Sequence, residues 1–255
     1  MKTVKKWLGT VSMIALGLSS LAVTADESKS FSETYDFSEN GSINLDNING
    51  NIEVTGWDKE EILLEYTITA DDEDDLDNIK VEIEHSEDDF DVEVDIDSGG
   101  FMSWGGSSGE VSFTLKVPHG VTLDSIESVN GNIEIEDVSG EIKAETVNGK
   151  IVIKNTAQDV KFGTVNGDVE VVVDTLSRSA RIKGDSVNGD IDIYLPENDG
   201  FELSSDTVNG DLSNDFDIEV DEGEFVGADM NGEYKSGGAS LKFDTVNGDI
   251  SIHKK

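Results

Sequence analysis

The segment Val-Asn-Gly, followed by Asp, Asn or Lys, recurs through the second half of the chain and constrains the fold more than any other feature. Asn-Gly pairs begin at Asn130, Asn148, Asn166, Asn188, Asn209, Asn231 and Asn247, with an outlying copy at Asn49. Successive asparagines from Asn130 are 18, 18, 22, 21, 22 and 16 residues apart. Self-similarity near a twenty-residue period is typical of one supersecondary unit stacked on itself.

The apolar residues alternate with polar ones over most of the chain, as they do between Ile62 and Ile68 and between Phe90 and Ile96. An apolar stripe at helical spacing nowhere runs for more than about two turns. The sequence therefore predicts an all-β protein.

An Asn-Gly pair is the strongest short-range signal for a two-residue hairpin. At Asn148-Gly149, however, a hairpin would pair Val147 with Lys150, and cross-strand partners share one face of a sheet. Because an apolar side chain would then share its face with a polar one, we interpret Asn-Gly as a corner of a coil instead. The side chains that we expect to point into the core of this coil are Ile142, Ala144, Val147, Ile151 and Ile153.

The spacing predicts that each turn of the coil, or rung, consists of two strand-plus-corner halves, with insertions that lengthen later rungs. Two insertions share one pattern, a strand end followed by Pro, a turn closed by Gly and then an apolar residue two positions before Leu, at residues 117–123 and 195–203. Consecutive rungs should pair as parallel strands about 4.8 Å apart, so that identical corner residues lie above one another. We expect roughly six or seven rungs.

Stacked asparagines can exchange side-chain amide hydrogen bonds along the axis of such a coil. This predicts a structural ladder rather than a ligand site for the repeated corner residues Asn130, Asn148, Asn166, Asn188, Asn209 and Asn247.

Three segments are expected along the chain. Residues 1–25 have three early lysines, an apolar stretch and small residues before a cut, which predicts a secretory signal peptide rather than a membrane anchor. Residues 26–120 should form an N-terminal β region, with a first rung near Asn49 and an irregular cap, and residues 121–255 the repeats. We expect no transmembrane anchor after cleavage, and an exported protein of the periplasm or the extracellular space.

The chain is strongly acidic, with 18 basic and 56 acidic residues and a formal charge of −38. Loss of residues 1–25 would remove three lysines and give −41. A field of this sign disfavours nucleic acid and anionic membranes as partners. The charge indicates either solubility in a salty medium or the binding of divalent cations.

The opening at residues 49–58, the Val-Pro-His-Gly-Val junction at 117–121 and the serial Thr-Val-Asn-Gly-Asp-Ile copies resemble a bacterial family. This is the β-strand-repeat domain family of unknown function labelled "putative adhesin". The resemblance covers nearly the whole chain after residue 25. It implies an exported envelope protein with a right-handed parallel β-helix-like or β-solenoid-like coil, no known enzymatic chemistry and no catalytic residues.

Little in the sequence favours catalysis. There is no cysteine, and the three histidines, His85, His119 and His253, fall in an acidic turn, a Pro-Gly turn and the C-terminal tail. Zinc would need three or four nitrogen or sulfur ligands at recognisable spacing. A carbohydrate-active β-helix enzyme would use paired carboxylates, but basic groups to hold an acidic sugar are sparse. We therefore expect no enzyme and no cofactor.

Calcium is the alternative that the carboxylates leave open. The residue after Asn-Gly is an aspartate in four copies, so stacked rungs can align oxygen ligands of the kind that Ca²⁺ prefers. These weak candidates are Asp168, Asp190, Asp211 and Asp249.

One Gly/Ser-rich loop carries three large apolar side chains, Phe101, Met102 and Trp104. They can form a contact tip for a partner or fold back as a cap over the end of the coil. Taken together, the sequence favours a non-enzymatic envelope scaffold that binds an unidentified protein or glycan, ahead of a Ca²⁺-dependent binding protein.

Overall fold

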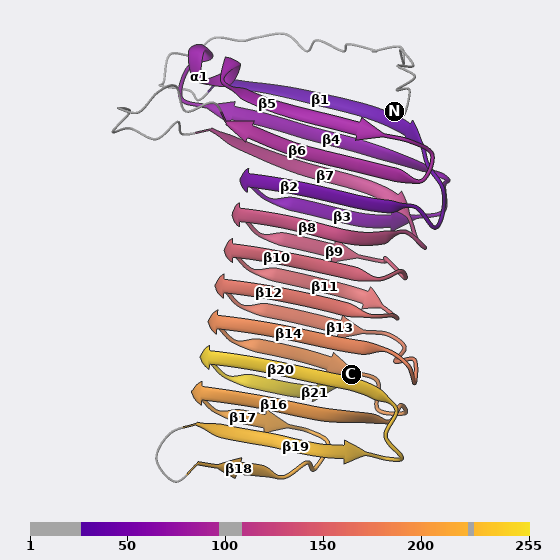
Figure 1. The fold of residues 1–255 in the computed structure, drawn as a ribbon, viewed down its shortest axis with the longest axis vertical. Coiled ribbons are helices and arrows are strands. Elements are labelled where there is room, and N and C mark those ends of the chain that lie inside the picture. The colour runs from indigo at the N-terminus through magenta and orange to yellow at the C-terminus, as the bar shows by residue number, and fades with distance from the viewer. Residues whose placement is uncertain (1–26, 97–108, 224–226) are drawn as a thin grey trace, which may run out of the picture.

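The structure, a computed structural model, describes residues 27–96, 109–223 and 227–255. Over these residues the chain forms 21 strands and one short helix, which confirms the all-β class. The strands stack along one long axis as two facing sheets with an apolar core between them (Figure 1).

We call the sheet that contains the strands before the Asn-Gly corners sheet B. Its described strands, in spatial order, are β18 (Val220–Glu222), β19 (Ala228–Tyr234), β16 (Phe201–Asn209), β20 (Ala239–Asn247), β14 (Arg181–Asn188), β12 (Val160–Asn166), β10 (Ile142–Asn148), β8 (Thr122–Asn130), β2 (Ser42–Asn49), β6 (Asp89–Ile96) and β5 (Ile79–His85).

The strands that follow the corners belong to sheet A. Its described strands, in spatial order, are β1 (Glu27–Asp36), β4 (Glu61–Ala70), β7 (Glu110–Pro118), β3 (Ile52–Trp57), β9 (Ile133–Glu136), β11 (Ile151–Thr156), β13 (Val169–Val173), β15 (Ile191–Leu195), β21 (Ile250–Lys254) and β17 (Leu212–Asn214).

A rung of the stack is one strand of sheet B, an Asn-Gly corner and one strand of sheet A, as in β10 and β11. Neighbouring rungs pair in parallel with identical motif positions in register, so that Asn148 lies opposite Asn166. Alternation within each strand sends Ile142 and Ala144 of β10 inward and leaves the side chains between them outside. The core thus consists of rows of inward-pointing side chains, and each rung contributes one residue to each row.

Core packing couples neighbouring rungs through side-chain size. Phe162 on β12 and Phe243 on β20 stack with ring centroids 6.1 Å apart, on either side of Gly184 on β14. A Cβ at Gly184 would lie 1.9 Å from the Phe162 ring, so glycine is required there. Two large side chains fit because the rung between them has none.

One expectation about the corner is wrong. Val147 does not point inward but is 39 % exposed, whereas Thr146 is buried at 4 %. The alternation set by Ile142 and Ala144 puts position 146 inside, and the Thr146 hydroxyl donates to the carbonyl oxygen of Gly131 at 3.0 Å. A threonine is therefore tolerated in the core because it satisfies a corner carbonyl.

The order of rungs in space differs from their order in the sequence at two places. β7 and β8 follow each other in the sequence, but in space the rung of β2 and β3 lies between their rungs. In the same way, the rung of β20 and β21 lies between the rungs of β15 and β16. The two places follow Pro118 and Pro196, so the Pro-Gly junctions are steps that skip a rung and not insertions into one. We call residues 42–57 and 239–254 the inserted rungs.

Both ends of the stack depart from parallel pairing, so the sheets are mixed. β4 pairs antiparallel with β7 and β1, β5 with β6, and β19 with β16 and β18. The short helix α1 (Glu73–Asp77), capped by the Asp72 side chain, connects β4 to β5. The copy at Asn231-Gly232 is not a corner, because it lies inside the antiparallel strand β19.

Candidate functional site

The asparagine side chains at the corners are joined in one line along the stack. Each Nδ2 donates to the Oδ1 of a neighbouring rung at 2.8–2.9 Å, and at one end Asn49 Nδ2 donates to the carbonyl oxygen of Gly109 at 3.0 Å. In spatial order the asparagines are Asn49, Asn130, Asn148, Asn166, Asn188, Asn247 and Asn209. These amides are used by one another, which leaves little capacity for a ligand.

The glycine of each corner is fixed by close approach of the neighbouring rung. A Cβ at Gly149 would lie 2.0 Å from the carbonyl oxygen of Gly131, and the same holds at Gly167 against Gly149. The Gly149 amide donates to the carbonyl oxygen of Asn166 at 3.0 Å. Glycine is therefore needed for stacking.

The four aspartates proposed as calcium ligands lie in one row, and three of them accept backbone hydrogen bonds from a neighbouring rung. Asp168 accepts from the amide of Asp190 at 3.1 Å, Asp190 from Asp249 at 2.8 Å, and Asp249 from Asp211 at 2.7 Å. Asn132 does the same for Lys150 at 2.8 Å. The side chain at this position can thus be an amide or a carboxylate, because either one can accept the backbone hydrogen bond. This indicates a structural role.

Thr, Asn, Gly and Asp of the Thr-Val-Asn-Gly-Asp motif each make a contact that stabilises the corner, and the valine side chain makes none. The valine side chains are between 39 and 47 % exposed and form one outward row on six neighbouring strands of sheet B. We call this the valine row, in spatial order Val129, Val147, Val165, Val187, Val246 and Val208. The partly exposed Ile48 of β2 occupies the same position one rung further on.

A row of acids runs beside the valine row, two residues earlier in each strand and on the same face of sheet B. It crosses all eleven described strands of the sheet and is interrupted only at Gly163. We call it the carboxylate row, in spatial order Glu82, Glu93, Asp46, Glu127, Glu145, Asp185, Asp244, Asp206, Asp229 and Asp221.

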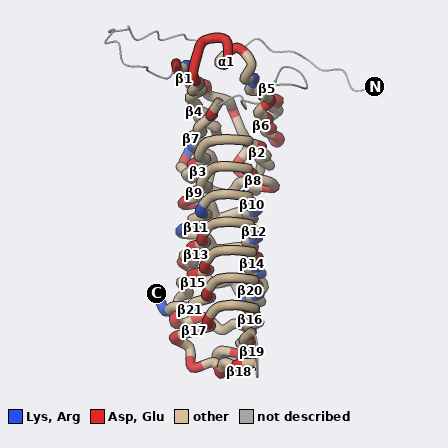
Figure 2. Tube along the Cα trace, turned by 90° about the vertical axis from the view of Figure 1, so that its left-hand side faces the viewer, with Lys and Arg blue, Asp and Glu red and all other residues tan. Residues whose placement is uncertain are grey.

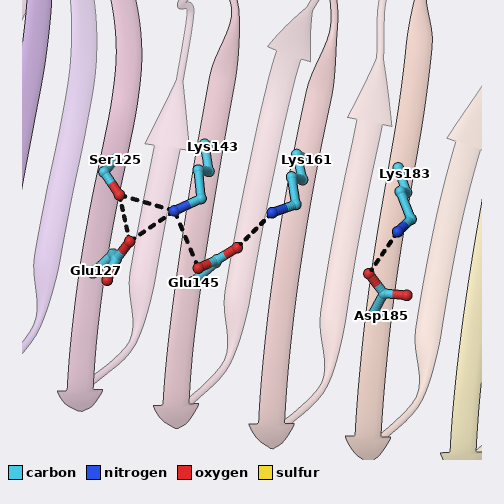
Figure 3. A network of polar contacts seen from close by, with 7 residues as sticks. All are labelled: Ser125, Glu127, Lys143, Glu145, Lys161, Lys183 and Asp185. Atoms are coloured by element: carbon cyan, nitrogen blue, oxygen red, sulfur yellow. Dashed lines mark hydrogen bonds and ion pairs between the residues drawn. The ribbon is translucent and has the colours of Figure 1, made fainter.

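Lysines compensate only the middle of the carboxylate row. Lys143, Lys161, Lys183 and Lys242 align on four neighbouring strands, two residues before the position of the carboxylate row. Figure 3 shows the first three of these lysines with Glu127, Glu145 and Asp185. Lys143 Nζ lies 2.8 Å from Glu127 Oε1 and 3.1 Å from Glu145 Oε2. We call these four residues the lysine row.

The pKa shifts along the carboxylate row follow this distribution of lysines. The hydrogen bond from Lys143 lowers the pKa of Glu127. At Glu145 burial acts to raise the pKa, but the hydrogen bonds from Lys161 and Lys143 outweigh it, and the pKa is lowered. Towards the ends of the row, burial and neighbouring carboxylates raise the pKa of Asp46 and that of Asp206.

A groove lies between the valine row and the carboxylate row. Residues between the two rows, such as Thr164, point inward, so only backbone forms the floor, and the walls are about 6.6 Å apart along the strand. Two hollows of about 600 and 650 Å³ share Asp185 and Ser186 and together follow the stack from β2 to β19. One wall is aliphatic and the other is anionic.

The remaining residues considered from the sequence form no reactive cluster in the described part of the chain. His119 Nδ1 lies 2.7 Å from the carbonyl oxygen of Asp137, His253 stacks on Tyr194, and His85 lies against Tyr35. No group of three or more His, Cys, Asp or Glu residues suited to hold a metal occurs there. Phe101, Met102 and Trp104 lie outside the described residues.

Sequence reasoning missed the groove. It assigned Val147 to the core and did not align carboxylates across strands that are far apart in the chain. One signal was present: if Thr146 is counted as an inward residue, period-two alternation places Val147 outside. The alignment of Lys183 with Lys242, 59 residues apart, follows from the inserted rung and has no local signature.

No helix among the described residues has the length and apolar character needed to cross a membrane. No curated protein matches the chain. Among solved structures, a "putative cell adhesion protein" from Clostridium sporogenes is 15 % identical with a TM-score of 0.53, over 91 % of this chain and all of that one. A "putative adhesin" from Bacteroides fragilis is 16 % identical with a TM-score of 0.36, over 89 % of this chain and 97 % of that one.

The first of these likenesses supports the two-sheet fold. The sequence family described as Toastrack DUF4097, whose function is unknown, matches residues 32–253, which is nearly the whole described chain. The chain belongs to the Toastrack DUF4097 family.

Proposed function

We propose that this chain is an exported, non-enzymatic binding module of the cell envelope, and that the groove on sheet B is its contact surface. The valine row carries the proposal. Six aliphatic side chains are held in solvent at one motif position, where the corner itself makes no use of them. Exposed apolar surface rimmed by polar residues marks interaction sites on soluble proteins.

The dimensions of the row suit a contact with a macromolecule. Five rung steps separate Val129 from Val208, a distance of about 24 Å at the usual strand spacing. The central rungs act as a right-handed parallel solenoid that repeats the same surface at each step. The cell adhesion named for the Clostridium sporogenes structure agrees with such a module.

Retention of isolated cell envelopes on beads that carry the purified protein tests the proposal. Val147→Thr combined with Val165→Thr keeps the branched shape and removes the apolar wall in two rungs. The matched control is Val152→Thr combined with Val172→Thr, on the sheet A strands of the same rungs. We expect the first variant to lose retention and the control to keep it. Equal retention by both would refute the assignment to sheet B.

A calcium-dependent module of the same shape remains the alternative to this proposal. It requires three of the four aspartates after the corners to exchange their backbone hydrogen bonds for metal ligation. We expect the melting temperature to be the same in EDTA and in millimolar Ca²⁺, and a rise with Ca²⁺ would favour the alternative. Release of products from a panel of glycans would instead favour an enzyme.

A further inference from the structure

The two walls of the groove differ in chemistry in a way that defines what fits between them. Side chains of the valine row and the carboxylate row project from the same face, two residues apart in each strand. A chain laid along the stack therefore meets aliphatic groups on one side and carboxylates on the other at every rung. This geometry points to an amphipathic peptide segment with aliphatic side chains along one edge and lysine or arginine along the other.

We propose that the groove binds such a cationic amphipathic segment of another protein. The inference rests on the proposed function, because it names the partner class of the same surface. It commits to a peptide because the acidic field of a chain with formal charge −38 disfavours nucleic acid and anionic lipid.

Unpaired carboxylates at both ends of the row supply the attraction. Among the described residues, no ion pair within 4 Å involves Asp46, Glu93 or Asp206, whereas Glu127, Glu145 and Asp185 have lysine partners. Carboxylates on neighbouring strands lie about 4.8 Å apart and repel each other. Cationic side chains of a partner relieve this repulsion where the lysine row does not reach.

The aliphatic wall makes the surface selective among cations. A plain polycation satisfies the carboxylates but leaves the valine row in water, whereas an amphipathic segment buries both walls. At Gly163 the carboxylate row has no side chain, and a Cβ there would meet the Glu145 side chain at 3.6 Å and the carbonyl oxygen of Asp185 at 4.0 Å. This interruption lies beside Val165 in the same hollow, so this rung offers the partner an aliphatic contact without a carboxylate of its own.

The length of the valine row sets the length of the segment. About 24 Å corresponds to about seven extended residues or about 16 helical residues. A 16-residue peptide therefore covers the row in either conformation, and lysine and leucine are arranged in two ways, alternating for an extended segment and at helical spacing for a helix.

The test is the affinity of the purified full chain for a labelled 16-residue peptide of lysine and leucine, measured by fluorescence anisotropy. An all-lysine peptide and a glutamate–leucine peptide of the same length are the probes for charge alone and for apolar contact alone. We expect the lysine–leucine peptide to bind more tightly than either. Val147→Thr with Val165→Thr should weaken its binding about tenfold, and the sheet A control, Val152→Thr with Val172→Thr, should stay within about twofold.

Carboxylate variants separate the two walls. Asp46→Asn with Asp206→Asn should weaken binding of the lysine–leucine peptide several-fold at low salt and much less at about 0.5 M salt, because exposed charges are screened. A melting temperature that does not fall in any of these variants shows that the surface and not the fold has changed. Equal affinity for the all-lysine peptide, insensitive to the valine variants, would overturn the proposal.

The outcome also separates this inference from the proposed function. If envelopes are retained through sheet B while the lysine–leucine peptide does not bind, the partner class is wrong and the binding surface stands. If neither envelopes nor peptide depend on the valine row, both are wrong.

Discussion

The middle of the stack and its two ends form the same rungs by different chain paths. In the middle, rung neighbours are 18 residues apart in the sequence, as at Asn130, Asn148 and Asn166. At the ends they are 81 residues apart between Asn49 and Asn130, and 59 between Asn188 and Asn247. The corners nevertheless have the same geometry. The motif therefore determines the structure of a rung, but it does not determine which rung lies beside it in space.

Both ends use one device to stop the stack. The chain skips a rung after Pro118 or Pro196, an inserted rung fills the gap, and antiparallel strands follow outward. Figure 2 shows that acidic residues occur along the whole stack and also at these ends, where lysines are few. An end built in this way does not present a regular parallel edge for further rungs.

The largest effect is expected from removing the second inserted rung. A chain that ends at Gly238 lacks β20 and β21, so the facing strands β14 and β16 lose their common partner. We expect hydrogen exchange to show loss of protection in β16 to β19, with β8 to β12 still protected. Full protection of β16 in the shortened chain would show that the inserted rung does not hold this end.

A pair of glycine variants tests stacking in the middle. Gly149→Ala places a Cβ 2.0 Å from the carbonyl oxygen of Gly131, whereas Gly163→Ala meets nothing closer than 3.6 Å. We expect a loss of about 3 kcal/mol in the free energy of unfolding for the first and less than about 0.5 kcal/mol for the second. Urea denaturation measures both, and equal losses would contradict the close contact.

The asparagine ladder allows a direct comparison of middle and end. Asn148 takes part in two side-chain hydrogen bonds along the ladder and Asn209, at its end, in one. Replacement by alanine should cost about 1–2 kcal/mol at Asn148 and about 0.5–1 kcal/mol at Asn209. Thermal unfolding measures the difference. If both variants lose the same, the amides do not act as a continuous ladder.

The smallest effect concerns pH, and its sign differs between the end and the middle. Because the pKa of Asp46 is raised in the folded state, its charged form destabilises the fold at neutral pH. Asp46→Asn should therefore be slightly more stable than the wild type at pH 7, with the gain lost as the pH falls through this raised pKa to the ordinary one. Because the pKa of Glu145 is lowered, Glu145→Gln should lose stability at pH 7 and match the wild type at low pH.

Stability measured from about pH 3 to pH 7 checks both signs. A loss of stability for Asp46→Asn at neutral pH would mean that Asp46 has a favourable partner and that the row is compensated at this end as well.

Part of this fold was accessible from the sequence because part of it is local. The corner at Asn148, the parallel register of neighbouring copies and the all-β class all follow from spacing and alternation over about twenty residues. The inserted rungs depend on contacts 59 and 81 residues apart in the chain, which leave no periodic signal. The copy at Asn231 shows the converse: it has the local dipeptide but lies in an antiparallel strand.

The candidate site was the harder part to predict because it is made of rows and not of motifs. Asp46 lies 81 residues before Glu127 in the chain although their strands are neighbours, and each is an ordinary surface acid by itself. Val147 was assigned to the core because it is apolar, although the buried Thr146 beside it decides the face. A polar residue that satisfies a corner carbonyl is the physical reason, and hydrophobicity alone does not reveal it.

Residues 239–254 are synthesised after the strands that flank them in space, and this affects how the protein folds. Residues up to 234 leave the ribosome first, and until the following segment arrives β14 and β16 have no strand between them. The nascent protein thus carries an open slot with unpaired amides and carbonyls on both sides. Two chains held close together at this moment can exchange these segments, so dilution during refolding should favour the monomer over a swapped dimer.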